Sequence, residues 1–290
     1  MHGSSAEVPV TVAAMQVVYR DAPATDIPNR EPADATEAIA WLEAGNRQFA
    51  GLAAGAAKRP DAPVPFVINT DFGVRAVVRG APEQRPFGLV LGCSDARVPI
   101  ELVFGRAVNE LFVVRVAGNT VGEDAIASLT YAADHFPTAK TIVVLGHSQC
   151  GAVAAAVDAF LKPRRVLDLA ATPHLRALVD RILVGVRTAA MALDETYGVD
   201  VKNREAYAWT LLHLAVFVNA AYVGFCVNAA LPASLRRRVV YGVYDIATAQ
   251  VTSGFDSIFA EPPTDAASFR ELALALATTP RMRELLSGAT

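Results

Sequence analysis

The chain has 290 residues, 53% of them hydrophobic and 19% charged, so it can bury a sizeable core. Its formal net charge is −3, with neither a basic field nor an acidic tail, and we expect no nucleic-acid partner. Three cysteines in so long a chain do not make a disulfide framework, and no signal peptide is visible. Both observations favour a reducing, cytoplasmic setting.

The N-terminal part is predicted to contain one helix between irregular segments. Residues 1–33 are rich in Pro, Ala and Asp and are predicted to form an extended arm, followed by a single domain over residues 34–290. Asp34 followed by Glu37 resembles a capping box and predicts a helix that runs toward Phe49. The stretch from Gly51 to Pro65 is rich in Gly, Ala and Pro and is predicted to be a loop.

Short β-branched runs then alternate with helical patterns. Such runs, with little internal alternation, are typical of strands buried on both faces of a parallel sheet. The predicted strands are Phe87–Leu91, Leu111–Val116, Thr141–Leu145 and Val239–Tyr244; the predicted helices are Glu123–Phe136, one from Gly151, Pro173–Tyr197, Asn203–Ala230 and Glu271–Leu286. The chain is therefore predicted to be α/β, with a mostly parallel central β-sheet flanked by helices and an N-terminal helical arm.

One segment, Trp209 to Leu231, is long and apolar enough to span a bilayer. It contains His213, Asn219 and Asn228, and no other segment resembles it. A helix that is apolar on all sides is equally suited to a large core or an oligomer interface. We therefore expect a buried helix and no membrane partner.

Two of the predicted strands end in a Gly followed by side chains that bind metals. The first continues as GCSDAR over residues 92–97, and the second as GHSQCG over residues 146–151. In open α/β sheets the ligand site lies outside the carboxyl ends of the strands, and a Gly there lets the backbone turn sharply. Both motifs therefore point toward one region of the fold.

The residue types in these motifs select the chemistry. Cys93, His147 and Cys150 supply two thiolates and one imidazole, a set that suits tetrahedral Zn²⁺. Cys150 also begins a predicted helix, whose N-terminus favours a thiolate. Three protein ligands leave one coordination position, as in catalytic zinc sites. Asp95 could fill that position or pair with Arg97.

Taken singly, these residues have simpler explanations. A cysteine is commonly a small buried hydrophobe, a lone histidine a hydrogen-bonded core residue, and a nearby Asp/Arg pair a loop salt bridge. Cys226 is expected in the core, and His135, His174 and His213 have no companion ligands at suitable spacing. No Walker loop, nucleotide-binding Gly fingerprint or nucleophile elbow is present. The joint placement of both motifs at matching strand ends favours the zinc site.

CSDAR at residues 93–97 and HSQCG at residues 147–151 resemble the paired zinc motifs of β-class carbonic anhydrases. The similarity runs from EAGNRQF in the predicted N-terminal helix, through ELFVVRVAGN at 110–119, to YDIATAQV at 244–251. The resemblance implies reversible hydration of CO₂ to bicarbonate and a proton, with Zn²⁺ as cofactor. It also implies a homodimer or a dimer of dimers, with N-terminal helices wrapping the partner and active sites near the interface.

The resemblance assigns further roles. Asp95 paired with Arg97 would leave the zinc open to water, whereas unpaired Asp95 would become a conditional fourth ligand and close the site. Gln84 matches a family glutamine that hydrogen-bonds the substrate. Part of the family has a non-catalytic bicarbonate site marked by a Trp where this chain has Val90, so we expect an open zinc.

Two alternative functions remain. A CS₂ or COS hydrolase on the same scaffold would use the same zinc ligands. A non-catalytic, zinc-stabilised protein for bicarbonate sensing or assembly would not need Asp95 and Arg97, and both are present.

Overall fold

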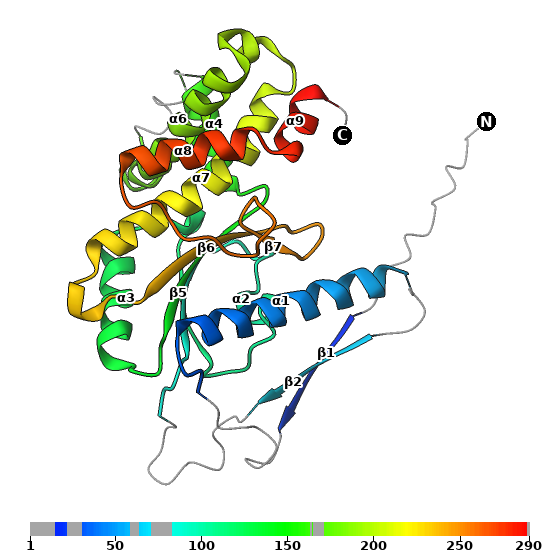
Figure 1. Cartoon of the computed structure of the whole chain (residues 1–290), viewed down its shortest axis with the longest axis vertical. Helices are drawn as coiled ribbons and strands as arrows, with labels where there is room; N and C mark the ends of the chain where they lie inside the picture. Colours follow the sequence, from blue (N-terminus) through cyan, green and yellow to red (C-terminus); the bar gives the residue numbers. More distant parts are fainter. Residues whose placement is uncertain are drawn as a thin grey trace.

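The computed structural model describes residues 15–21, 31–58, 64–70, 83–162, 164 and 171–288. At its centre lies a five-stranded sheet of order β4-β3-β5-β6-β7 (Figure 1). Its strands are β3 (Gly88–Gly92), β4 (Leu111–Arg115), β5 (Thr141–His147), β6 (Arg238–Tyr244) and β7 (Val251–Thr252). The first four pair in parallel, and only β7 runs antiparallel to its neighbour β6. The predicted mostly parallel sheet is confirmed.

Both faces of this sheet are buried, as the continuous apolar strands predict. Leu89 and Leu91 of β3 pack into one core, and Val90 packs into the other, because successive side chains of a strand point to opposite faces. The helices on the first face are α3 (Glu123–His135), α4 (Gly151–Leu161), α6 (Pro173–Tyr197), α7 (Tyr207–Ala230), α8 (Ala266–Ala277) and α9 (Pro280–Ser287). The second face is covered by α1 (Ala35–Lys58) and the short α2 (Ile100–Val103).

The N-terminal region holds more regular structure than predicted. Helix α1 continues to Lys58 and a strand begins at Val64, so the loop prediction is wrong for residues 51–58 and 64–65. Ala and Leu dominate residues 51–58, and their high helix propensity together with the burial of Ala56 offsets two glycines. Within the predicted arm, β1 (Met15–Asp21) forms a parallel pair with β2 (Val64–Thr70), and both lie alongside α1 (Figure 1). The rest of the arm before residue 31 lies outside the described residues.

The C-terminal region also differs from its prediction. One helix was expected over residues 271–286, and that prediction is wrong, because α8 and α9 are separate. The break falls before Pro280, which has no N–H to continue a helix and suits the first position of a new one. Helix α8 begins earlier than predicted because Asp265 and Ser268 form a capping box.

Helix α7 is the apolar segment whose burial was predicted. Among the described residues it is the one helix long and apolar enough to cross a membrane, and 67% of its most apolar stretch is buried. It contacts β5 and β6 as well as α4, α6, α8 and α9 (Figure 1), while Trp209 near its start is 44% exposed. Because most of its apolar stretch is covered by these neighbours, the apolar composition of the helix fits a place in the core.

Candidate metal centre

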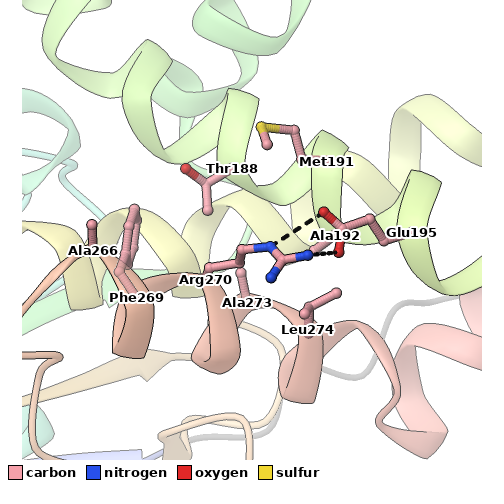
Figure 2. Close-up of a pocket in the computed structure, with 9 residues that line it drawn as sticks. All are labelled: Thr188, Met191, Ala192, Glu195, Ala266, Phe269, Arg270, Ala273 and Leu274. Atoms are coloured by element: carbon pink, nitrogen blue, oxygen red, sulfur yellow. Dashed lines mark hydrogen bonds and ion pairs between the residues drawn. The ribbon is translucent and has the colours of Figure 1, made fainter.

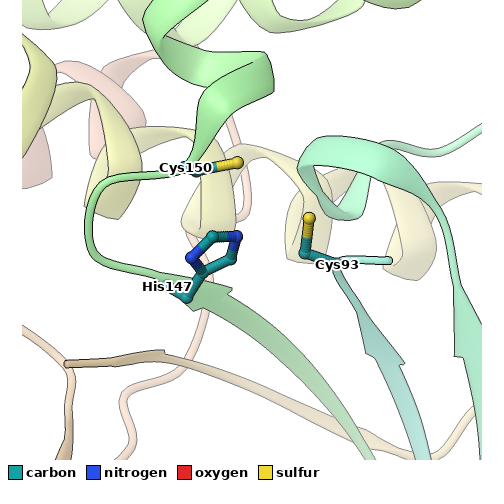
Figure 3. Close-up of side chains that lie close together, drawn as sticks. All are labelled: Cys93, His147 and Cys150. Carbon is teal, nitrogen blue, oxygen red and sulfur yellow. The ribbon is translucent and has the colours of Figure 1, made fainter. Parts of the chain in front are cut away.

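The two motifs meet because their strands are neighbours. β3 and β5 pair in parallel with Gly92 opposite Leu145, so their carboxyl ends share one edge of the sheet. Cys93 follows β3 directly, and His147 is the last residue of β5. The chain then turns through Gln149, whose φ is 55°, and Cys150 caps the N-terminus of α4. Figure 3 shows the three side chains converging from these elements.

These three side chains fit a metal ion. The Cys93 and Cys150 sulfurs and a ring nitrogen of His147 all lie within 4.8 Å of one another, and all three residues are buried. The His147 Nδ1 lies 2.9 Å from the Ser148 carbonyl, which can only accept, so Nδ1 carries the proton. Its Nε2 is buried and has no hydrogen-bond partner among the described residues. A lone pair left unpaired in the core among two sulfurs fits a zinc ligand.

The Cys93 sulfur lies in surroundings that favour its thiolate. The Gly118 N–H donates to the Cys93 Sγ over 3.2 Å. Interaction with Cys150 is the largest cause that lowers the pKa of Cys93, and the same contact raises the pKa of Cys150. These contacts favour the thiolate of Cys93, the form that binds metal.

Asp95 is held by Arg97 rather than pointing freely at the cluster. Arg97 donates to Asp95 from its backbone N (2.9 Å), its Nε (2.9 Å) and its Nη2 (2.7 Å). This guanidinium holds the pKa of the Asp95 carboxyl well below its usual range. The Asp95 Oδ2 lies 3.8 Å from the His147 Nε2, so the paired carboxylate borders the cluster. The structure thus contains the paired arrangement of the two that the resemblance describes.

Arg115 and Gly118 support the site although their roles were not predicted. Arg115 donates to the Cys93 carbonyl (3.2 Å) and to the Asp95 carbonyl (2.7 Å), and so fixes the backbone of the first motif. In the sequence, the role of Arg115 was indicated only by its charge at the end of the apolar run LFVVR. The contact of Gly118 with Cys93 had no such signal, because a glycine has no side chain to suggest it.

Other candidate residues lie apart from the cluster. Gln84 is exposed and precedes β3, whereas Cys93 follows it, so the five residues of β3 separate them by about 16 Å. A single chain therefore does not bring Gln84 to the zinc ligands. Cys226 is half-buried on α7, and burial is the main cause that raises its pKa.

A separate hollow lies between α6 and α8 (Figure 2). It has a volume of about 220 Å³ and is lined largely by apolar side chains, among them Met191 and Phe269. Its one acidic side chain, Glu195, pairs with Arg270 over 2.6 Å. Because this carboxylate is paired, and because the described residues that line the hollow include no Cys or His, they do not form a metal site.

The part of the chain that contains the cluster is similar to known proteins. The family described as Carbonic anhydrase matches residues 88–251, more than half of the chain. Carbonic anhydrase 2 of Mycobacterium tuberculosis is 33% identical over 175 residues, covering 58% of this chain and 73% of the relative. A carbon disulfide hydrolase of Acidianus sp. is 38% identical over 81 residues, covering 28% of this chain and 38% of that protein. A Coccomyxa β-carbonic anhydrase in complex with acetazolamide matches at a TM-score of 0.47 and 26% identity, over 76% of this chain and 85% of that one.

Proposed function

This chain belongs to the β-carbonic anhydrase family, and we propose that it hydrates CO₂ reversibly to bicarbonate and a proton at the Cys93–His147–Cys150 cluster. The observation that carries the proposal is this buried cluster, bordered by an aspartate that an arginine holds in place. Two thiolates and one imidazole would hold Zn²⁺ and leave one coordination position for chemistry. When bound, Zn²⁺ supplies the Lewis acidity that makes water a nucleophile near neutral pH, as is known from carbonic anhydrases.

The protein's own residues would orient the reactants. Asp95, kept ionised by Arg97, can only accept hydrogen bonds and would hold a donor beside the cluster. Arg97 also reaches the Gln149 carbonyl over 3.4 Å and so links the two motif loops. This linkage supports a resting state in which Asp95 stays with Arg97 and the fourth position remains open.

We further propose that the active form is a homodimer or a dimer of dimers in the cytoplasm. β4 is an edge strand of the sheet, and its outer side has no strand partner among the described residues. Gln84 lies at the opposite end of β3 from the zinc ligands, so it could contact substrate only in the site of another copy. The oligomeric size in solution and the KM for CO₂ are measured for Gln84→Ala and for wild type. The comparison tests whether Gln84 contributes both to assembly and to substrate binding.

The second candidate function is hydrolysis of CS₂ or COS. It is favoured by the similarity to a carbon disulfide hydrolase, and such an enzyme could use the same ligand set. Release of sulfide from CS₂ by the zinc-loaded protein, measured beside CO₂ hydration, separates the two. Sulfide release without CO₂ hydration would replace the main proposal by this one.

The direct test is stopped-flow CO₂ hydration by the purified protein together with analysis of bound zinc. We expect Asp95→Asn to retain zinc and to lose about 100-fold or more in kcat, the range for a group that handles a reacting proton. Asp134→Asn, on the exposed surface of α3, is the matched control and should keep wild-type activity. A zinc-loaded wild type inactive from about pH 7 to 9, where a catalytic zinc water is ionised, would refute the proposal. Loss of zinc in Asp95→Asn would mean that Asp95 is an obligatory ligand.

A further inference from the structure

The peptide groups around Gly118 connect helix α7 to a zinc ligand. The Gly118 N–H donates to the Cys93 Sγ at 3.2 Å, and the Gly118 carbonyl accepts from the Nδ2 of Asn219 at 3.1 Å. Asn219 lies on α7 and is 1% exposed. Because a carbonyl oxygen can only accept, the amide nitrogen of Asn219 must be the atom that faces it. The backbone of Gly118 therefore contacts a side chain of α7 through its carbonyl and the sulfur of Cys93 through its N–H.

This arrangement is packed too tightly to shift freely. Gly118 has a φ of +65°, and a Cβ built there would lie 2.8 Å from the Ile182 Cδ1. On the other side of Asn219, a Cβ on Gly185 would lie 3.1 Å from the Asn219 Cα, so α6 and α7 cross closely here. The crossing fixes where the Asn219 amide lies, and the amide fixes the Gly118 carbonyl.

We propose that Asn219 is a positioning residue for the metal centre, acting through Gly118 on the Cys93 thiolate. A hydrogen bond to a metal-bound thiolate orients the sulfur and withdraws charge from it, and partners beyond the direct ligands commonly change metal affinity. The Gly118 N–H and the Gly118 carbonyl belong to the two successive peptides that this residue joins, so the N–H stays directed at the sulfur only while the φ and ψ of Gly118 are held. Asn219 fixes the second of these peptides through its carbonyl, so loss of Asn219 should change the zinc–sulfur bond as well as protein stability. The inference rests on the proposed zinc site.

A purely structural role predicts something different, and Asn46 serves as the comparison. Asn46 is 2% exposed on α1, where its Nδ2 donates to the Val103 carbonyl (3.2 Å) and the Ala249 carbonyl (3.1 Å). Its Oδ1 accepts from the Val251 N–H (2.8 Å). It is thus a buried amide on the other face of the sheet, with no contact to the zinc ligands. Asn46→Ala should lower stability and leave the metal unchanged.

The experiment compares Asn219→Leu and Asn219→Asp with Asn46→Ala and wild type. Leu keeps the approximate size of Asn within an apolar helix, while Asp places a carboxylate oxygen against the Gly118 carbonyl. Zinc affinity is measured by chelator competition, and the cobalt-substituted proteins report the sulfur-to-metal charge-transfer band. We expect both Asn219 variants to bind zinc about tenfold more weakly and to shift the band to longer wavelength, because a thiolate that loses a donor is easier to oxidise.

Each outcome decides the question. Affinity and band changes in Asn219→Leu that are absent from Asn46→Ala support the proposal, even if Asn219→Asp does not fold. Wild-type affinity and spectrum in Asn219→Leu overturn it, as do equal changes in Asn219→Leu and Asn46→Ala, which would indicate general destabilisation. A wild type that takes up no zinc removes the proposed function itself, and this inference falls with it.

Discussion

Gly45 offers a test of how helix α1 packs against the second face of the sheet. A Cβ built on Gly45 would lie 1.7 Å from the carbonyl oxygen of Phe104, the residue that caps α2, and 2.5 Å from its carbon. The obstacle is backbone, which cannot move aside like a flexible side chain. Gly51 lies in the same helix, and a Cβ there would meet nothing within 4 Å.

The two substitutions to Ala therefore share the same gain in helix propensity, but only the one at Gly45 adds strain from overlap with the backbone. Ala in place of Gly within a helix stabilises by about 1 kcal/mol at both positions. At Gly45 the overlap adds a strain of about 3 kcal/mol, the upper end for overpacking in a core. The shared term cancels, so Gly45→Ala should be less stable than Gly51→Ala by about 3 kcal/mol. At 2–4 °C per kcal/mol, the Tm values should differ by about 6–12 °C.

The assay is thermal unfolding followed by circular dichroism, at one protein concentration because association would change the apparent Tm. Wild type should fall between the two variants. If Gly45→Ala melts with Gly51→Ala, α1 does not lie against the Phe104 carbonyl, and the packing described for this face is wrong.

Three further predictions concern the metal, the C-terminal helices and acid stability. Removal of zinc should lower the Tm, because zinc present at 1,000 times its Kd adds about 4 kcal/mol to the free energy of unfolding. It should also make two more thiols react with a thiol reagent. An unchanged Tm and an unchanged thiol count would mean that the cysteines hold no metal. Deletion of residues 263–290 removes buried Leu276 and Leu285 from beside α7, so the remaining chain should be recovered as insoluble protein, and a soluble, zinc-loaded product would contradict the buried position of α7. Asp265 accepts the Ser268 N–H, which lowers its pKa below the ordinary 3.8, so the stability that it adds is full above that value and is lost as the pH falls through the native pKa. The difference in urea midpoint between wild type and Asp265→Ala should be constant from pH 7 to 5 and shrink near pH 3; a difference that persists there would show that the cap does not depend on the charge.

The sequence alone determined the ligand set and the strands that carry it. Cys93, His147 and Cys150 stand out because ligand chemistry depends on residue type, and strand ends are marked by local periodicity and glycine. The parallel sheet was predictable for the same reason, since strands buried on both faces are continuously apolar. Elements whose signals are mixed were predicted less well. The last part of α1, residues 51–58, contains glycines that suggest a loop, and it is helical because the propensity of its Ala and Leu residues and the burial of Ala56 offset them.

Only the tertiary structure decided what surrounds the ligands. Asn219 and Gly118 are separated by 101 residues, and nothing in the sequence near either residue indicates that α7 brings them together. The placement of Gln84 away from the cluster follows from the length and direction of β3, although its spacing from Cys93 matches the family pattern. The apolar composition of α7 fits a membrane and a core equally, and in the structure two strands and several helices pack against it. Local sequence specifies which atoms can bind the metal, whereas contacts between distant segments specify how those atoms are held.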